Sequence, residues 1–358
     1  MSIPLSIPYT AMEMRKRGHS AAAVDSLIYQ NPHGFLIMLS DESRVPREII
    51  LRRILHELAD TDWSGSPPEV SQLLHRIIRD ETSNLDPYRE LKDRMNRLAL
   101  AALPACRDLI GTAADPQGAV LRIAVAGNLL DAGAKVQIQP EDFPGMLATL
   151  YDQPLVGDLQ ELFRAAATAK RILYLADNAG EIVFDRLLIE ALPHDRMTVA
   201  VRGRPVLNDA LLEDATLAGI PELVPVIDNG SDAPGTVLGD CSPEFLKHFH
   251  GADLIIAKGQ GNYETLSQVA APIFFLFTVK CPLVAAHIGS PPGTLVAKRT
   301  SASSMKAMAR RPPPSRRISA SSEFPGPKAL RVKTIRCLKT TGMGKSWRDI
   351  KAWLSLGA

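Results

Sequence analysis

The 358-residue chain has few cysteines and lacks the long apolar segments that cross membranes. Its four cysteines are far apart and form no Cys-x-x-Cys pair; they are Cys106, Cys241, Cys281 and Cys337. This pattern argues against a zinc site or a disulfide scaffold and suits a reducing cytoplasm, where we expect the protein to reside. No run approaches the roughly 20 apolar residues of a membrane span. The N-terminus has no basic stretch before an apolar core, so we expect neither a signal peptide nor a membrane partner.

Two glycine-rich signatures of nucleotide binding are also missing. No GxxxxGK[ST] phosphate-binding loop occurs, and GxGxxG is absent from the first turn between a predicted strand and a helix. The segment Lys258-Gly259-Gln260-Gly261-Asn262 is therefore neither a phosphate-binding loop nor a dinucleotide fingerprint.

Charge is unevenly distributed along the chain, although the net charge is only +2. Residues 299–358 contain 14 of the 41 Lys and Arg but only 2 of the 39 Asp and Glu. The remaining 27 basic and 37 acidic residues make 1–298 acidic, so we expect no nucleic-acid partner for the body. The basic tail is rich in Ser, Ala and Pro, which predicts a disordered extension. A polyanion-binding arm is the less favoured alternative.

The pattern of apolar residues divides the body into two predicted domains. Residues 1–115 have helical periodicity and predict an all-α domain, with helices at Glu48 to Leu58, Glu69 to Asp80 and Leu91 to Leu109. Residues 116–298 alternate between strand-like and helical runs, which predicts a Rossmann-like, mostly parallel sheet with helices on both faces. The predicted strands are Ile172 to Ala176, Met197 to Val201, Leu223 to Ile227, Leu254 to Ala257 and Ile273 to Thr278.

The segment from Arg171 to Glu190 contains the first of the polar clusters that we consider functional. A short apolar run is followed by Asp177-Asn178-Ala179-Gly180-Glu181 and then by a helical pattern. Asp177 and Asn178 should therefore lie at the carboxyl end of a strand, where ligands bind in open α/β sheets. A carboxylate there can hold a phosphate through a hard divalent cation. The alternative is that Asp177 only caps the following helix.

Further polar clusters follow other predicted strands or lie in loops of the α/β part. They are Gly127-Asn128 with Asp131, Asn208-Asp209, Asp228-Asn229-Gly230, and Lys258 to Asn262. Each alone is ordinary turn chemistry. Together they supply oxygen ligands for a cation, glycines that permit close approach of the backbone, and a lysine to neutralise phosphate charge.

In this order the motifs GN-x-x-D, DNAGE-x-x-x-D, ND, NG-x-D-x-x-G, KGQGN-x-E and VKCP resemble the damage-control phosphatase family, also known as domain of unknown function 89. The similarity is to subfamily I, which is marked by Lys-Gly-x-x-Asn, and it extends from about Pro67 to about Lys298. One departure is Ser6-Ile7-Pro8-Tyr9, where subfamily I commonly has Cys-x-x-Cys. The resemblance implies a metal-dependent phosphatase acting on small phosphorylated metabolites such as sugar phosphates.

The resemblance also implies roles for individual residues, by their positions in these motifs. The implied metal ligands are Asp177, Asn178 and Asp209. The implied catalytic residues are Asp177, Asp209 and Lys258. The implied substrate-binding residues are Asn128, Asp131, Glu181, Lys258, Asn262 and Lys280. For Lys280, the alternative is that VKC merely ends a core strand. Asp214 is expected in a helix, and His248 and His250 at the end of a surface helix.

Several alternatives stay open at this point. The cation is Mn²⁺, Mg²⁺, Co²⁺ or Ni²⁺, since oxygen ligation favours hard ions but does not choose among them. The rival activities are an S-adenosylmethionine-dependent methyltransferase and a non-catalytic protein that binds phosphorylated metabolites. The sequence specifies neither the metabolite, nor the oligomeric state, nor whether water attacks directly or through a phospho-aspartate.

Overall fold

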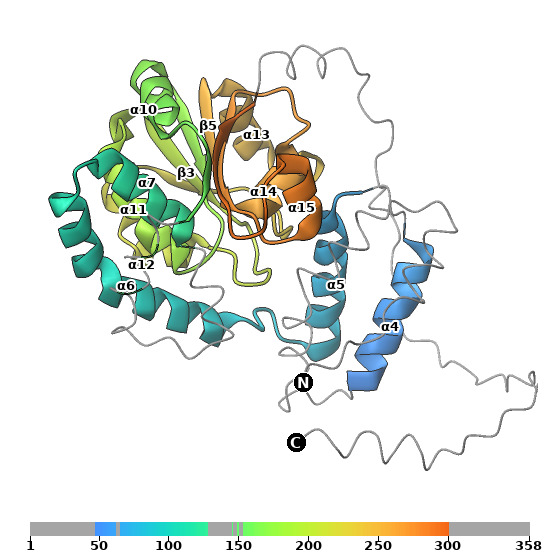
Figure 1. Cartoon of the computed structure of the whole chain (residues 1–358). Helices are drawn as coiled ribbons and strands as arrows, with labels where there is room; N and C mark the ends of the chain where they lie inside the picture. Colours follow the sequence, from blue (N-terminus) through green and yellow to red (C-terminus); the bar gives the residue numbers. More distant parts are fainter. Residues whose placement is uncertain (1–46, 62–64, 128–144, 146–148, 150–152, 301–358) are drawn as a thin grey trace, which may run out of the picture. The chain divides into compact units, whose positions relative to one another are not determined.

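The computed structural model describes residues 47–61, 65–127, 145, 149 and 153–300 (Figure 1). The tail, the first 46 residues and the predicted site residues Asn128 and Asp131 lie outside these ranges. Among the described residues, the helices before the sheet are α4 (Arg47–Asp60), α5 (Pro67–Thr82), α6 (Arg89–Thr112) and α7 (Pro116–Ala126). Ser66 and Glu69 form a capping box at the start of α5, with Pro67 in its first turn.

The described residues of the α/β part form a seven-stranded sheet and the helices between its strands. The strands are β1 (Leu155–Gly157), β2 (Ile172–Leu175), β3 (Met197–Val201), β4 (Val226–Asp228), β5 (Leu254–Lys258), β6 (Ile273–Thr278) and β7 (Leu295–Arg299). The α-helices are α10 (Leu159–Thr168), α11 (Glu181–Ala191), α12 (Leu212–Leu217), α13 (Pro243–Gly251), α14 (Gly259–Leu266) and α15 (Pro282–Ile288). Short 3-10 turns are η2 (His194–Arg196), η3 (Ile220–Glu222) and η4 (Leu238–Asp240).

The strands form one sheet in the order β1-β7-β6-β5-β2-β3-β4, in which only the β6–β7 pair is antiparallel. From β2 the chain builds the sheet toward β3 and β4, and it then crosses back to place β5 on the other side of β2. The order therefore reverses between β2 and β5. In open α/β sheets, such a switch point is where the carboxyl ends of the strands leave room for a ligand.

Both faces of the sheet are covered, because successive side chains along each strand point to opposite faces. On one face Ile172 and Tyr174 of β2 lie in a core with α6, α7, α10 and α11. On the other, Leu173 and Leu175 lie in a core with α13, α14 and α15. The two sets of helices flank the strands in Figure 1. Residues of α4 and α5 form a further core around Ile54 and Ile77.

The fold class predicted from the sequence is confirmed: a mostly parallel sheet with helices on both faces, preceded by helices. One strand begins later than expected, at Val226, because Pro225 interrupts the apolar run and Leu223 follows a 3-10 turn. Strands β1 and β7 were not predicted. Within the described ranges, no helix has the length and apolar character needed to cross a bilayer.

Candidate functional site

Two loops that are distant in sequence are joined by main-chain hydrogen bonds at the carboxyl edge of the sheet. Asn178, just after β2, forms an antiparallel bridge with Asp209, in the loop that follows β3. The amide of Ala179 donates to the carbonyl of Asn208, and the amide of Ala210 to the carbonyl of Asp177, both at 2.8 Å. The backbone thus brings together the three predicted metal ligands.

The side chains at this bridge carry more negative than positive charge. Asn178 Nδ2 donates to Asp177 Oδ2 at 3.0 Å and to Glu181 Oε2 at 3.3 Å. Burial, followed by the charges of Asp209 and Glu181, raises the pKa of Asp177 well above its ordinary value. Arg202 and Lys280 oppose this rise in the pKa only in part. A cation bound among these oxygens would stabilise their ionised forms.

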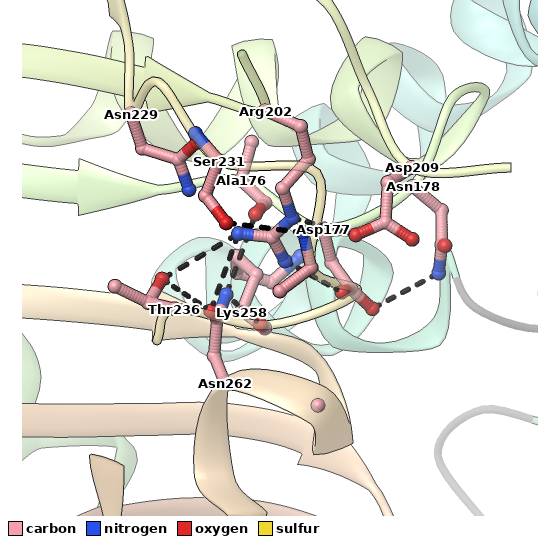
Figure 2. Close-up of polar contacts among 12 residues, drawn as sticks. Ala176, Asp177, Asn178, Arg202, Asp209, Asn229, Ser231, Thr236, Lys258 and Asn262 are labelled. Carbon is pink, nitrogen blue, oxygen red and sulfur yellow. Dashed lines mark hydrogen bonds and ion pairs between the residues drawn. The ribbon is translucent and has the colours of Figure 1, made fainter. Parts of the chain in front are cut away.

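A buried arginine that the sequence analysis did not select lies between the two aspartates. Arg202 follows β3, and its Nε donates to Asp209 Oδ2 at 2.6 Å. Its Nη2 lies 3.6 Å from Asp177 Oδ1, and its side chain is only 2 % exposed. Its Nη1 reaches Asn262 Oδ1 at 3.4 Å and Thr236 Oγ1 at 3.5 Å. The guanidinium therefore contacts four side chains of the site (Figure 2).

Asn262 joins the carboxyl ends of β2 and β5 from the first turns of α14. Its Nδ2 donates to the carbonyl of Lys258 at 2.8 Å and to that of Ala176 at 3.4 Å. Its Oδ1 accepts from the Thr236 hydroxyl at 2.7 Å as well as from Arg202. The amide is completely buried. In this arrangement Asn262 holds neighbouring protein groups, and its predicted contact with a substrate stays a prediction.

Lys258, the other residue of the subfamily marker, lies in a buried ionic network. Its Nζ donates to Glu181 Oε1 and Asp185 Oδ1, each at 2.5 Å, and to the carbonyl of Ala124 at 2.9 Å. Burial alone would lower the pKa of Lys258, but Asp185 and Glu181 outweigh it and raise the pKa. The ammonium is thus held charged beneath Glu181, with no exposed surface. Contact between Lys258 and a substrate, as predicted from the sequence, also stays a prediction.

Two glycines with positive φ lie in the backbone beside these side chains. Gly259 has φ +78°, and a Cβ added there would lie 1.9 Å from Asp177 Oδ2. Gly180 has φ +74° and is the N-cap of α11, and its amide donates to Asn96 Oδ1 of α6 at 2.6 Å. Asn96 in turn donates to Asp214 Oδ1 at 2.7 Å. An element outside the sheet thereby fixes the loop that carries Asp177.

The other predicted residues have varied surroundings. Lys280 is exposed just after β6, close enough for its charge to lower the pKa of Asp177, and its amide donates to Gln260 Oε1. Asp214 lies in α12 as expected. His248 and His250 occupy the exposed last turn of α13, also as expected. The alternative that Asp177 caps a helix is wrong, because the cap of α11 is Gly180.

The donor set can be tested for its fit to a divalent cation. Across the described part of the chain, no group of three or more His, Cys, Asp or Glu is placed to hold a metal ion. The candidate set is instead mixed: two carboxylates and one amide side chain, on loops joined by the bridge. Oxygen donors of this kind suit Mg²⁺ or Mn²⁺. Burial is the largest cause of the raised pKa of Asp177, and the charges of Asp209 and Glu181 add to it. A bound cation would offset both effects, so this set of oxygen donors fits a cation.

Sequence reasoning missed the residues that support the ligands. Asp185 was part of the quoted motif, and its spacing of four from Glu181 places both carboxylates on one helical face. Arg202 is distinguished from its exposed neighbour Arg204 only by directly following a buried strand. Nothing in the sequence pointed to Asn96 or Thr236.

Comparisons with known proteins show the family of the chain. A profile described as the damage-control phosphatase ARMT1-like domain matches residues 24–296. An uncharacterized protein of Methanocaldococcus jannaschii is 39% identical over 254 residues, covering 67% of this chain and 80% of the relative. A protein of Archaeoglobus fulgidus named damage-control phosphatase is 36% identical over 230 residues, covering 63% of this chain and 80% of the relative.

A third relative, a damage-control phosphatase of Pyrococcus horikoshii, is 40% identical over 184 residues, which are 50% of this chain and 63% of the relative. The crystal structure of a DUF89 family protein from the same organism has a similar fold, with a TM-score of 0.67 and 30% sequence identity. That match covers 78% of this chain and 98% of the crystallised one.

Proposed function

Because the chain belongs to the damage-control phosphatase ARMT1-like family, we propose that it is a metal-dependent phosphatase of small phosphorylated metabolites. The observation that carries this proposal is the bridge between Asn178 and Asp209 at the switch point of the sheet. It gathers two carboxylates and an amide at the edge where α/β proteins bind ligands. Sugar phosphates are the substrate class that we favour, as the sequence resemblance implies.

The proposed metal ligands are Asp177, Asn178 and Asp209. A divalent cation bound there would polarise a phosphate oxygen and lower the pKa of a bound water. Glu181 accepts a hydrogen bond from the Asn178 amide and so orients it. Lys258, buried beneath Glu181, holds that carboxylate in place. We therefore assign Lys258 a positioning role in this proposal.

Substrate phosphate would be bound at the exposed edge of the same cluster. Lys280 is the exposed cation there, and its charge already acts on Asp177. Helices α11 and α14 both begin at this edge, directly after the β2 loop and β5, with their N-termini at the site. The positive ends of these helices favour an anion. Lys280 and the two helix ends would thus stabilise charge on the transferring phosphoryl group.

The test is phosphate release from a panel of sugar phosphates and an aryl phosphate, after chelation and with each divalent metal added back. We expect release only with metal, and its loss in Asp177→Asn and Asp209→Asn. Asp195→Asn is the matched control, because Asp195 is exposed on η2. Undiminished metal-dependent release by Asp177→Asn would refute the site. A folded wild type that binds metal and phosphate without hydrolysis would favour the binding-protein alternative.

A further inference from the structure

The guanidinium of Arg202 links both carboxylates of the candidate metal set to the buried amide of Asn262. We propose that Arg202 is a positioning residue for metal binding, which holds Asp209 and Asp177 in the arrangement that a divalent cation requires. This inference rests on the proposed metal site and extends it to a residue that touches neither metal nor phosphate in the proposal.

The first support is the geometry of the contact with Asp209. The Arg202 Nε to Asp209 Oδ2 distance of 2.6 Å is short, as in hydrogen bonds between two charged groups. The backbone makes a parallel link, since the Arg202 amide donates to the carbonyl of Ala210 at 3.0 Å. Asp209 is thus held against the end of β3 by main chain on one side and by a side chain on the other.

The second support is that the protein also fixes the other edge of the guanidinium. Its Nη1 lies between Thr236 Oγ1 and Asn262 Oδ1, which are themselves hydrogen-bonded at 2.7 Å. All three side chains are at most 2 % exposed. Asn262 is anchored to the carbonyl groups of Ala176 and Lys258. The arginine is therefore tied to the ends of two strands besides its own.

The third support is the contact with Asp177, which is an ion pair and not a hydrogen bond. Nη2 lies 3.6 Å from Asp177 Oδ1 and, among the described residues, is a buried nitrogen with no hydrogen-bond partner. This attraction draws Asp177 toward Arg202 and so toward Asp209, while Asp177 Oδ1 makes no short hydrogen bond to the guanidinium. One planar cation with several fixed N–H directions can serve all these partners, whereas the ammonium of a lysine cannot.

Positioning and charge predict opposite effects on metal affinity, which makes the inference testable. Arg202 carries a positive charge beside the candidate cation site, so charge alone predicts that its removal tightens metal binding. Loss of a group that orients metal ligands typically weakens binding about 10- to 100-fold. We therefore expect Arg202→Gln to bind Mn²⁺ about 10- to 100-fold more weakly than the wild type. Arg202→Lys should also be weakened, although it keeps the charge.

The experiment is Mn²⁺ titration of the chelated full-length protein by calorimetry, with thermal unfolding of each metal-free variant. Arg204→Gln is the matched control, because Arg204 is exposed two residues away, and its Mn²⁺ affinity should be unchanged. Thr236→Val removes one hydroxyl that contacts Arg202 and should cause a smaller loss of affinity. If Arg202→Gln fails to fold, Arg202→Lys and Thr236→Val decide the question.

The outcomes separate this inference from the proposed function. Mn²⁺ affinity in Arg202→Gln that equals or exceeds that of the wild type would overturn the inference and leave the metal site standing. If Arg202→Lys bound Mn²⁺ as tightly as the wild type, the positive charge of the arginine alone would explain its role, and the inference would again be overturned. A lower unfolding temperature with unchanged Mn²⁺ affinity would show a merely structural role. No Mn²⁺ binding by the wild type would refute the metal site itself, and the inference with it.

Discussion

Replacing Lys258 with methionine should destabilise the protein strongly and in a pH-dependent way. The substitution keeps an apolar stem of similar length but leaves Glu181, Asp185 and the carbonyl of Ala124 without their shared donor. Removing one partner from a buried ion pair lowers the free energy of unfolding by about 3–5 kcal/mol. All of these contacts are within the protein interior, so salt will screen the effect little.

The pH dependence follows from Asp185. Burial raises its pKa from 3.8 to about 6, with Lys258 lowering it and Glu181 raising it. Since the pKa of Asp185 in the folded protein is above its ordinary value, ionised Asp185 lowers the free energy of unfolding. In the wild type this loss of stability begins at about pH 4, grows as the pH rises, and is constant above pH 6. Without Lys258 the pKa rises further. In the variant, the free energy of unfolding therefore keeps falling above pH 6, by up to about 1.4 kcal/mol per pH unit, until the pH reaches the new pKa.

The measurement is urea unfolding in the presence of chelator at pH 6 and pH 8. We expect Lys258→Met to lose more stability at pH 8 than at pH 6, and the double variant with Asp185→Asn to recover part of the loss. Lys247→Met, on the exposed side of α13, is the control and should stay within about 0.5 kcal/mol of the wild type. A Lys258→Met protein as stable as this control, or a loss equal at both pH values, would refute the reasoning.

Three further predictions concern groups around the site. Burial would raise the pKa of Asp232, but hydrogen bonds from α5 outweigh burial and lower the pKa to about 2. Asp232→Asn should therefore lower the free energy of unfolding by about 2 kcal/mol at pH 7. That difference should shrink as the pH falls from about 4 toward 2, in urea unfolding curves. Gly259→Ala should weaken Mn²⁺ binding through its clash with Asp177, whereas Gly289→Ala, with the similar φ of +77° but open space, should only lower the unfolding temperature. Asn96→Ala should lower the free energy of unfolding by about 1–3 kcal/mol and speed hydrogen exchange at the amide of Gly180, the N-cap of α11. Unchanged exchange at this amide would contradict the prediction.

Much of the fold was predictable because the central strands are buried on both faces. Four apolar runs, those of β2, β3, β5 and β6, were located to within a residue. Such strands lie between two layers of helices and need apolar side chains on both sides. Strand β1 has only three residues, and β7 ends in exposed Lys298 and Arg299, so neither produces a clear apolar run. These two strands depend on pairing with each other and with β6, which the local sequence does not reveal.

The site was predictable only in part. Asp177, Asn178 and Asp209 follow buried strands, and parallel strands end at one edge, which is why their proximity could be inferred. The partners of Lys258 could not be, because its side chain reaches α7 and α11 on one side of the sheet. A sequence motif records which residues occur together and gives no direction for a side chain. The same motif accommodates a lysine facing solvent or one facing the interior.

The bridge between Asn178 and Asp209 fixes the distance between the two loops by main-chain contacts, whereas the side chains supply the metal ligands. Main-chain hydrogen bonds hold the two loops together, and they do not depend on which side chains the two positions carry. An exchange of aspartate for histidine at position 209, to suit a softer metal, would therefore leave the main-chain bridge in place. Lengthening a loop would be far less forgiving, because an inserted residue would break the bridge and displace both positions at once. The main-chain frame would be kept, but a ligand exchanged at Asp209 or Asp177 would also need a new partner for the buried guanidinium of Arg202.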